Sequence, residues 1–189
     1  MKTVAVFGSS RRDEKSAFWA EAYELGQLLA AAGYTVLSGG YGGSMGAVSR
    51  GAAESGAHVI GVTCAVFDPG PCNEWLTEEV KAPSLLARLG TMIERSDAFV
   101  ALRGGIGTLS ELTLVWSLLQ TRELKGKPLV LLGADWREVV AALKEHTDLG
   151  SSIAALAKIV ETPGQVLAEL SEFAALAAPP TPPGPPPLG

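Results

Sequence analysis

The chain has 189 residues, of which 47% are hydrophobic and 19% charged, with a net charge of −5 at pH 7. This length and composition predict one domain with a substantial core. The acidic balance argues against a nucleic-acid partner, which normally requires a basic face. No apolar run approaches the roughly 20 residues that span a bilayer. The chain starts without a signal-peptide pattern, so we expect a cytoplasmic protein with no membrane partner.

Short apolar strands alternate with longer amphipathic helices along the chain. Strands are predicted at 3–7, 35–38, 58–63, 97–102, 128–132 and 157–161. Helices are predicted near 15–32, 44–55, 84–96, 108–121, 135–147 and 163–176. The strands are near-continuous apolar runs, as expected when both faces of a sheet are buried. The alternation predicts an α/β, Rossmann-like, doubly wound parallel sheet forming a single domain over residues 1–177.

Two segments fall outside this pattern. Residues 64–83 contain three prolines and one glycine, and we predict that they form a loop with a short helix over one end of the sheet. Residues 178–189 hold seven prolines and are predicted to form an extended, disordered tail, since proline cannot join a helix interior or a central strand. Cys64 and Cys72 are expected to be structural thiols, although a disulfide between them is possible. With only two histidines in the chain, we expect no metal site.

Three of the predicted strands run into turns rich in glycine and serine. Glycines let a phosphate approach the backbone closely, and free N–H groups at a helix start bind anions. In the commonest order of such sheets, the strands at 3–7 and 97–102 flank the point where the order reverses, so these turns should meet in one crevice. The candidate phosphate- and nucleotide-binding residues are Gly8, Ser9, Ser10, Gly39, Gly40, Gly42, Gly43, Met45, Arg103, Gly104, Gly105, Gly107 and Thr108.

The two standard phosphate-binding motifs are absent from these turns. No Gly-x-x-x-x-Gly-Lys-Ser/Thr occurs, and the turn after the first strand lacks Gly-x-Gly-x-x-Gly. Dinucleotides and nucleoside triphosphates are therefore disfavoured as ligands. The pattern favours a monophosphate held by backbone amides and by the hydroxyls of Ser9, Ser10 and Thr108.

Three charged residues near the turns each have more than one interpretation. Thr108-Leu109-Ser110-Glu111 matches a helix capping box, so Glu111 acts as a cap, as an acid beside the anion site, or as both. Arg88 precedes the strand at 97–102 and is either a solvated helix charge or a group directed at the same crevice. Arg103 either binds phosphate with two hydrogen bonds or points into water.

These motifs resemble those of the Lonely Guy (LOG) family of cytokinin riboside 5′-monophosphate phosphoribohydrolases, formerly labelled lysine decarboxylases. The family hallmark Pro-Gly-Gly-x-Gly-Thr-x-x-Glu is matched by Arg103–Glu111 except at its first position. Its glycine-rich segment Gly-Gly-Gly-x-x-Gly-x-Met-Gly is matched loosely by Ser38–Gly46, and its opening Val-Phe-x-Gly-Ser-Ser resembles Val6–Ser10. The resemblance extends from about residue 3 to residue 133.

The resemblance implies hydrolysis of the N-glycosidic bond of a nucleoside 5′-monophosphate, of the AMP or cytokinin ribotide type, to free base and ribose 5-phosphate. It implies Glu111 and Arg88 as the catalytic residues, no cofactor, and a homodimer. Pyridoxal-dependent lysine decarboxylation is disfavoured because no lysine lies at either glycine turn. Arg103 stands where the family has proline, and Leu89 where it has lysine. These departures leave open a non-catalytic nucleotide or molybdenum-cofactor carrier.

Overall fold

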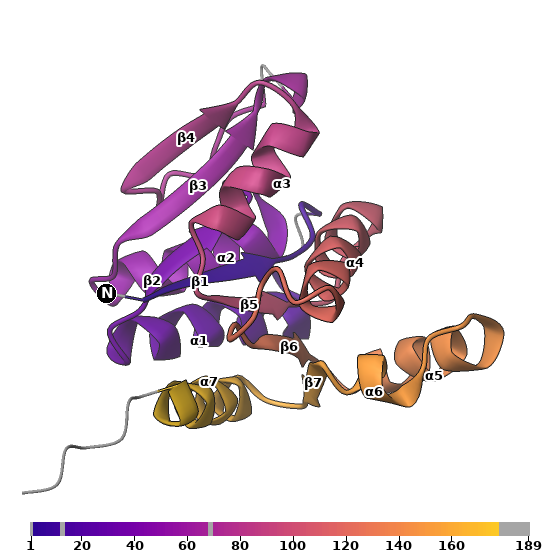
Figure 1. Ribbon diagram of the computed structural model, residues 1–189. Helices are drawn as coiled ribbons and strands as arrows, with labels where there is room; N and C mark the ends of the chain where they lie inside the picture. Colours follow the sequence, from indigo (N-terminus) through magenta and orange to yellow (C-terminus); the bar gives the residue numbers. More distant parts are fainter. Residues whose placement is uncertain (1, 12–13, 68–69, 178–189) are drawn as a thin grey trace, which may run out of the picture.

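A seven-stranded parallel sheet with helices on both faces forms the centre of the computed structural model, which describes residues 2–11, 14–67 and 70–177 (Figure 1). The strand order is β4-β3-β2-β1-β5-β6-β7, and every neighbouring pair is parallel. The strands are β1 (Thr3–Phe7), β2 (Thr35–Ser38), β3 (Val59–Cys64), β4 (Glu78–Ala82), β5 (Ala98–Ala101), β6 (Leu129–Leu132) and β7 (Ala157–Val160). The doubly wound prediction is confirmed, and the order reverses between β1 and β5 as expected.

The helices divide between the two faces of the sheet. The helical segments are α1 (Ala17–Ala31), α2 (Gly43–Glu54), the 3-10 turn η1 (Ala65–Phe67), α3 (Leu85–Glu94), α4 (Ile106–Gln120), α5 (Trp136–His146), α6 (Ser151–Ala154) and α7 (Pro163–Ala177). Buried residues of α1, α2 and α7 pack on one face, and those of α3, α4 and α5 pack on the other. No helix in the described part of the chain is long and apolar enough to cross a membrane.

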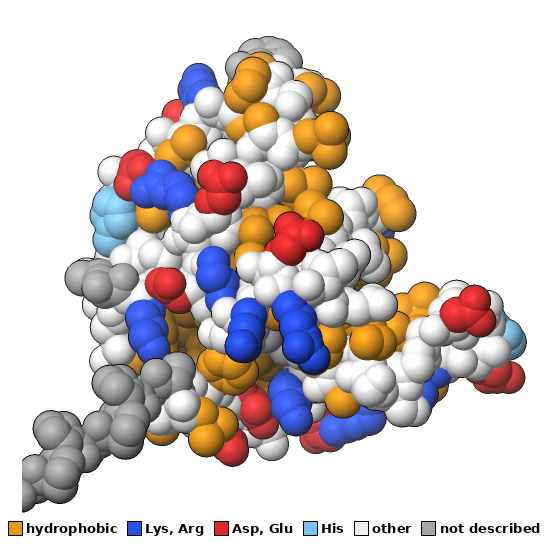
Figure 2. Space-filling model, in the orientation of Figure 1, with side chains coloured by type: hydrophobic (Ala, Val, Ile, Leu, Met, Phe, Trp, Pro, Cys, Tyr) orange, Lys and Arg blue, Asp and Glu red, His pale blue; other side chains and the backbone are white. Residues whose placement is uncertain are grey.

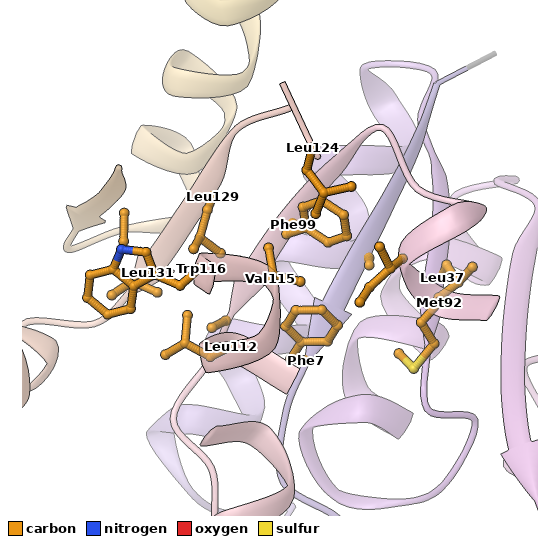
Figure 3. Close-up of a cluster of buried hydrophobic side chains, with 14 of the residues drawn as sticks. Phe7, Leu37, Met92, Phe99, Leu112, Val115, Trp116, Leu124, Leu129 and Leu131 are labelled. Carbon is orange, nitrogen blue, oxygen red and sulfur yellow. The ribbon is translucent and has the colours of Figure 1, made fainter. Parts of the chain in front are cut away.

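Alternation along β1 explains how one short strand serves both cores. Val4 and Val6 join the cluster under α1 and α2, whereas Ala5 and Phe7 join the cluster under α3 and α4. In that second cluster the rings of Phe7 and Phe99 stack with centroids 6.0 Å apart, and side chains of α4 cover them (Figure 3). Because both faces of the central strands are buried, their residues are nearly all apolar, and the sequence therefore predicts them as apolar runs.

The prediction that residues 64–83 form only a loop and a short helix is wrong in its second half. A short 3-10 turn does occur at Ala65–Phe67, but Glu78–Ala82 forms β4, an edge strand paired in parallel with β3. Because β4 carries charged residues, it is not an apolar run, and the apolar pattern does not predict it. Charged residues are typical of edge strands. The short helix α6 was also not predicted. The proline-rich tail predicted at 178–189 lies outside the described residues.

Glu78 links the edge strand to its neighbours. Arg95 Nη1 donates to Glu78 Oε1 at 2.6 Å, and His58 Nε2 lies 3.0 Å from Glu78 Oε2. The hydrogen bond from Arg95, followed by that from His58, lowers the pKa of Glu78 from 4.5 to about 2. A carboxyl with a depressed pKa stabilises the fold fully above its ordinary pKa, and that contribution is lost as the pH falls from 4.5 toward 2.

We therefore expect Glu78→Gln to lower Tm at neutral pH, by at most about 4 °C because the pair is partly exposed. The difference from wild type should shrink below pH 4.5. Thermal unfolding across pH 2.5–7 measures it, and Glu74→Gln, at an exposed position on the preceding loop, is the matched control. A Tm difference that stays constant across this range would contradict the role assigned to the ionised Glu78 carboxylate.

Candidate active site

A cavity of about 850 Å³ opens at the carboxyl ends of β1, β2 and β5. All three glycine- and serine-rich turns contribute to its lining, which confirms that they converge. The lining residues among those predicted are Gly8, Ser9, Ser10, Gly42, Met45, Arg88, Arg103, Gly104, Gly105, Gly107, Thr108 and Glu111. The reversal of strand order between β1 and β5 explains why the cavity forms here, since the connections leave the sheet in opposite directions on its two sides.

A buried ion pair lines this cavity. Arg88 of α3 donates from Nη1 to Glu111 Oε1 of α4 at 2.9 Å, and from Nε to the Val62 carbonyl at 2.7 Å. Arg88 and Glu111 are only 7% and 5% exposed. The solvated interpretation of Arg88 is therefore wrong. Gly39 lies against the same guanidinium, where a Cβ would collide with Arg88 and would stand 2.6 Å from the Met45 sulfur.

Glu111 does not cap its helix. The capping box requires Thr108 at the N-cap, whereas α4 begins at Ile106 with Gly105 as its N-cap. Glu111 consequently falls in the second turn, where its carboxylate binds Arg88 instead of a backbone N–H. Burial raises the pKa of the Glu111 carboxyl above its ordinary value, although the charge and hydrogen bond of Arg88 oppose the rise. A carboxylate with a raised pKa suits proton transfer at moderate pH.

The starts of α2 and α4 both line the cavity. The N-cap residues of α2 and α4 are Gly42 and Gly105, and neither makes a side-chain cap hydrogen bond. In α4 the first N–H groups therefore remain available to an anion, whereas in α2 the Ser44 N–H already donates to the Ser9 carbonyl. Gly104 must be glycine in this arrangement, because a Cβ there would lie 2.5 Å from the Cβ of Thr108. This end of the cavity has the composition of a phosphate cradle.

Hydrogen bonds between Ser9 and Ser44 join the turns after β1 and β2. Ser44 Oγ accepts from the Ser9 N–H at 2.9 Å, and the Ser44 N–H donates to the Ser9 carbonyl at 3.0 Å. A Cβ on Gly8 would lie 2.5 Å from the same Ser44 oxygen. Ser44 was not predicted as a site residue, because nothing in the local sequence indicates its partner on another strand.

Three of the predicted glycines support the turns and do not line the cavity. Gly39 makes room for Arg88, while Gly40 and Gly43 adopt positive φ angles of 77° and 66°. Gly40 packs against Gly61 and Thr63 of β3, and Gly43 packs against the backbone of residues 9–11. Glycine is favoured at both positions because other residues rarely adopt such angles.

Arg103 stands at the rim of the cavity. Its Nη1 donates to Asp135 Oδ2 at 2.8 Å, and its guanidinium carbon lies 4.6 Å from the centroid of the Phe18 ring. The side chain is 61% exposed. An exposed ion pair of this kind contributes little to stability, so the guanidinium can exchange Asp135 for a ligand anion at small cost.

Sequence reasoning missed the aromatic side chains of the cavity. Phe18, Trp19, Tyr41 and Phe67 all line it. None of them stands at a defined position of a periodic or spaced motif. Tyr41 lies within the glycine-rich turn, at a position that the motif leaves unspecified. Cys64 and Cys72 are unpaired thiols, buried and exposed respectively. Within residues 2–11, 14–67 and 70–177, no group of three or more His, Cys, Asp or Glu side chains is arranged to hold a metal ion.

The SLOG cluster4 family model matches residues 1–162. The chain belongs to this family. It is 33% identical over 184 residues to the probable cytokinin riboside 5′-monophosphate phosphoribohydrolase LOG4 of Oryza sativa subsp. japonica, covering 93% of this chain and 79% of the relative. It is 34% identical over 138 residues to the phosphoribohydrolase LOG3 of Arabidopsis thaliana, covering 71% and 63%. These matches confirm the family resemblance seen in Arg103–Glu111.

Solved structures share the fold of this SLOG protein. TM1055, a structural-genomics target, is 27% identical with a TM-score of 0.72, covering 91% of this chain and 99% of its own. The molybdenum cofactor binding protein of Rippkaea orientalis is 24% identical with a TM-score of 0.71, covering 92% and 97%. At that identity the second likeness concerns the fold alone.

Proposed function

We propose that this SLOG protein hydrolyses the N-glycosidic bond of a nucleoside 5′-monophosphate, of the AMP or cytokinin ribotide type, releasing free base and ribose 5-phosphate. The observation that carries the proposal is the buried Arg88–Glu111 pair in a cavity that also holds the uncapped start of α4. A carboxylate beside an anion cradle is what cleavage of a sugar phosphate requires. The named activity of the LOG relatives supports the same reaction.

Glu111 is the catalytic carboxylate in this proposal. Cleavage of the bond between C1′ and the base passes through an oxocarbenium-like state, which a nearby carboxylate stabilises. The electron pair of the broken bond leaves with the base, which gains a proton. Glu111 orients a water molecule and accepts its proton as the water oxygen bonds to C1′, and that proton then passes to the departing base, which restores the carboxylate. No cofactor takes part in this reaction.

Arg88 is a positioning residue. Its guanidinium is anchored by the Val62 carbonyl and fixes one oxygen of Glu111. Its positive charge also opposes the effect of burial on the Glu111 carboxyl, which keeps the ionised form accessible. With both groups buried, the carboxylate has a single orientation before substrate arrives, and such preorganisation favours catalysis.

The phosphate is assigned to the β1 and β5 end of the cavity. The N–H groups at residues 104–108, the hydroxyls of Ser9, Ser10 and Thr108, and the Arg103 guanidinium supply donors there. Gly42 and Met45 line the adjoining wall. Hydrogen bonds to a charged group contribute about 1.5–3 kcal/mol each, so the phosphate is expected to dominate binding.

Release of ribose 5-phosphate from AMP and cytokinin ribotides by the purified protein tests the function. Adenosine, which lacks the phosphate, is the control substrate, and its kcat/KM should be at least about tenfold lower. Binding of AMP without release of ribose 5-phosphate would contradict the hydrolase and would favour a nucleotide or molybdenum-cofactor carrier.

We infer further that the protein acts as a cytoplasmic homodimer. Exposed apolar side chains support the dimer: Leu85 and Leu86 begin α3, Ile106 begins α4, and Leu86 and Ile106 are 80% and 81% exposed. Figure 2 shows hydrophobic side chains gathered over the part of the surface where α3 and α4 lie. The two unpaired cysteines suit a reducing compartment.

A further inference from the structure

The strand order arranges the cavity from one end to the other. Along the carboxyl edge of the sheet the order is β3, β2, β1, β5. Phe67 follows β3, Tyr41 follows β2, Ser9 follows β1 and the 104–108 turn follows β5, and all of them line the cavity. Polar donors therefore occupy the β1 and β5 end, whereas the rings of Tyr41 and Phe67 occupy the β2 and β3 end.

The rings of Tyr41 and Phe67 form one rigid surface, here called the aromatic wall. They meet edge to face, with centroids 5.5 Å apart and planes at 83°. The Tyr41 hydroxyl accepts from the Cys64 N–H at 2.8 Å and donates to the Cys64 carbonyl at 3.2 Å. Asn73 Nδ2 donates to the Tyr41 carbonyl at 3.1 Å, which fixes the backbone as well. Phe67 nevertheless remains 48% exposed, so part of its ring is open to a ligand in the cavity.

We propose that the aromatic wall is the subsite for the base, and that it recognises the base by stacking and contact area without hydrogen-bond readout. This rests on the proposed function. With the phosphate at the β1 and β5 end and the ribose beside Glu111, the base extends toward Tyr41 and Phe67. Planar heterocycles stack on exposed aromatic faces and edges, a contact that tolerates any base because every base has a π-face.

The polar groups of the aromatic wall already form hydrogen bonds within the protein, and this supports the claim that the base is not read by hydrogen bonds. Both functions of the Tyr41 hydroxyl are engaged by Cys64, and the Gly70 N–H donates to the Phe67 carbonyl at 2.7 Å. Among the described lining residues at this end, the side chains of Met45 and Pro71 likewise carry no hydroxyl, amide or charged group. Sites that read a substrate by hydrogen bonds reject analogues by about 10⁴–10⁵-fold, whereas apolar sites discriminate by about 10²-fold or less. The aromatic wall is an apolar site, so we expect it to discriminate weakly between bases.

A matched pair of variants tests the location. Phe67 and Phe18 are both phenylalanines that line the cavity, 48% and 46% exposed, but Phe18 lies beside Arg103 at the opposite end. We expect Phe67→Ala to raise KM for AMP about 5- to 100-fold, the usual effect of removing a stacking partner, with kcat changed less than about threefold. The inhibition constant of ribose 5-phosphate, which has no base, should stay unchanged. Phe18→Ala, beside the proposed phosphate donor Arg103, should change KM for AMP and the inhibition constant of ribose 5-phosphate by the same factor.

Equal effects of Phe67→Ala on AMP and on ribose 5-phosphate, or an effect of Phe18→Ala confined to AMP, would overturn the assignment. The readout claim predicts that KM values for AMP and GMP differ by less than about tenfold, and a difference of about 10³-fold or more would overturn it. If the protein releases no ribose 5-phosphate, the proposed hydrolase fails while the wall is still tested. In that case the dissociation constants of AMP, GMP and ribose 5-phosphate for the same variants replace KM and the inhibition constant, with the same expected ratios.

Discussion

Replacing Glu111 by glutamine is expected to lower kcat for AMP hydrolysis by about 10²–10⁴-fold, the usual contribution of a positioned general base. The amide oxygen of glutamine still accepts the hydrogen bond from Arg88 Nη1, so the shape of the site is kept while the negative charge is removed. The measurement is release of ribose 5-phosphate, with the AMP dissociation constant measured alongside by calorimetry. We expect AMP to bind within about threefold of wild type, because the phosphate contacts are elsewhere.

Glu94→Gln, at the exposed end of α3, is the matched control and should retain full activity. Undiminished turnover in Glu111→Gln would show that Glu111 takes no part in the chemistry.

The pH profile of kcat/KM provides a second test of Glu111. Since burial raises the pKa of Glu111, its carboxyl releases a proton only above the ordinary value of 4.5. The acid limb of kcat/KM should therefore lie above pH 4.5 in wild type, and it should be absent from any residual activity of Glu111→Gln.

Replacing Arg88 by methionine is expected to destabilise the fold by about 3–5 kcal/mol, because it leaves the Glu111 charge buried without a partner. The Val62 carbonyl loses its donor in the same change. Urea unfolding measures the loss. The loss should shrink as the pH falls, because Glu111 then takes up a proton and becomes neutral.

The double variant Arg88→Met, Glu111→Leu separates stability from catalysis. Replacing a buried ion pair by apolar side chains of similar volume is often neutral or stabilising, so we expect the double variant to regain most of the stability lost in the single one. It should have no detectable hydrolase activity. A single variant as stable as wild type, or an active double variant, would contradict the role given to the pair.

The architecture follows from the sequence because parallel strands leave a strong signal. Burial on both faces makes each central strand an apolar run, and helices of ordinary length separate the runs. The usual strand order of such sheets then predicts that β1 lies beside β5. It also predicts that three turns distant in the sequence meet at this edge of the sheet. The edge strand β4 carries glutamates and a lysine because one side of it meets solvent, so the same signal is absent.

The role of Glu111 shows where local patterns mislead. Thr108 and Glu111 have the spacing of a capping box, but glycines ahead of them allow the helix to begin at Ile106. The partner of Glu111 is Arg88, 23 residues away on another helix, and only the packing of α3 and α4 on the sheet brings them together. The aromatic wall has the same origin, since Tyr41 and Phe67 follow two different strands and share no motif.

The central claim is that this cavity breaks the bond between the ribose 5-phosphate and the base. A ³¹P NMR time course of AMP with the wild-type protein, with free base quantified in the same samples, tests it most directly. We expect the AMP signal to be replaced by that of ribose 5-phosphate, with one equivalent of adenine released. An AMP signal that persists while calorimetry shows AMP bound, or its replacement by inorganic phosphate and adenosine, would contradict the claim.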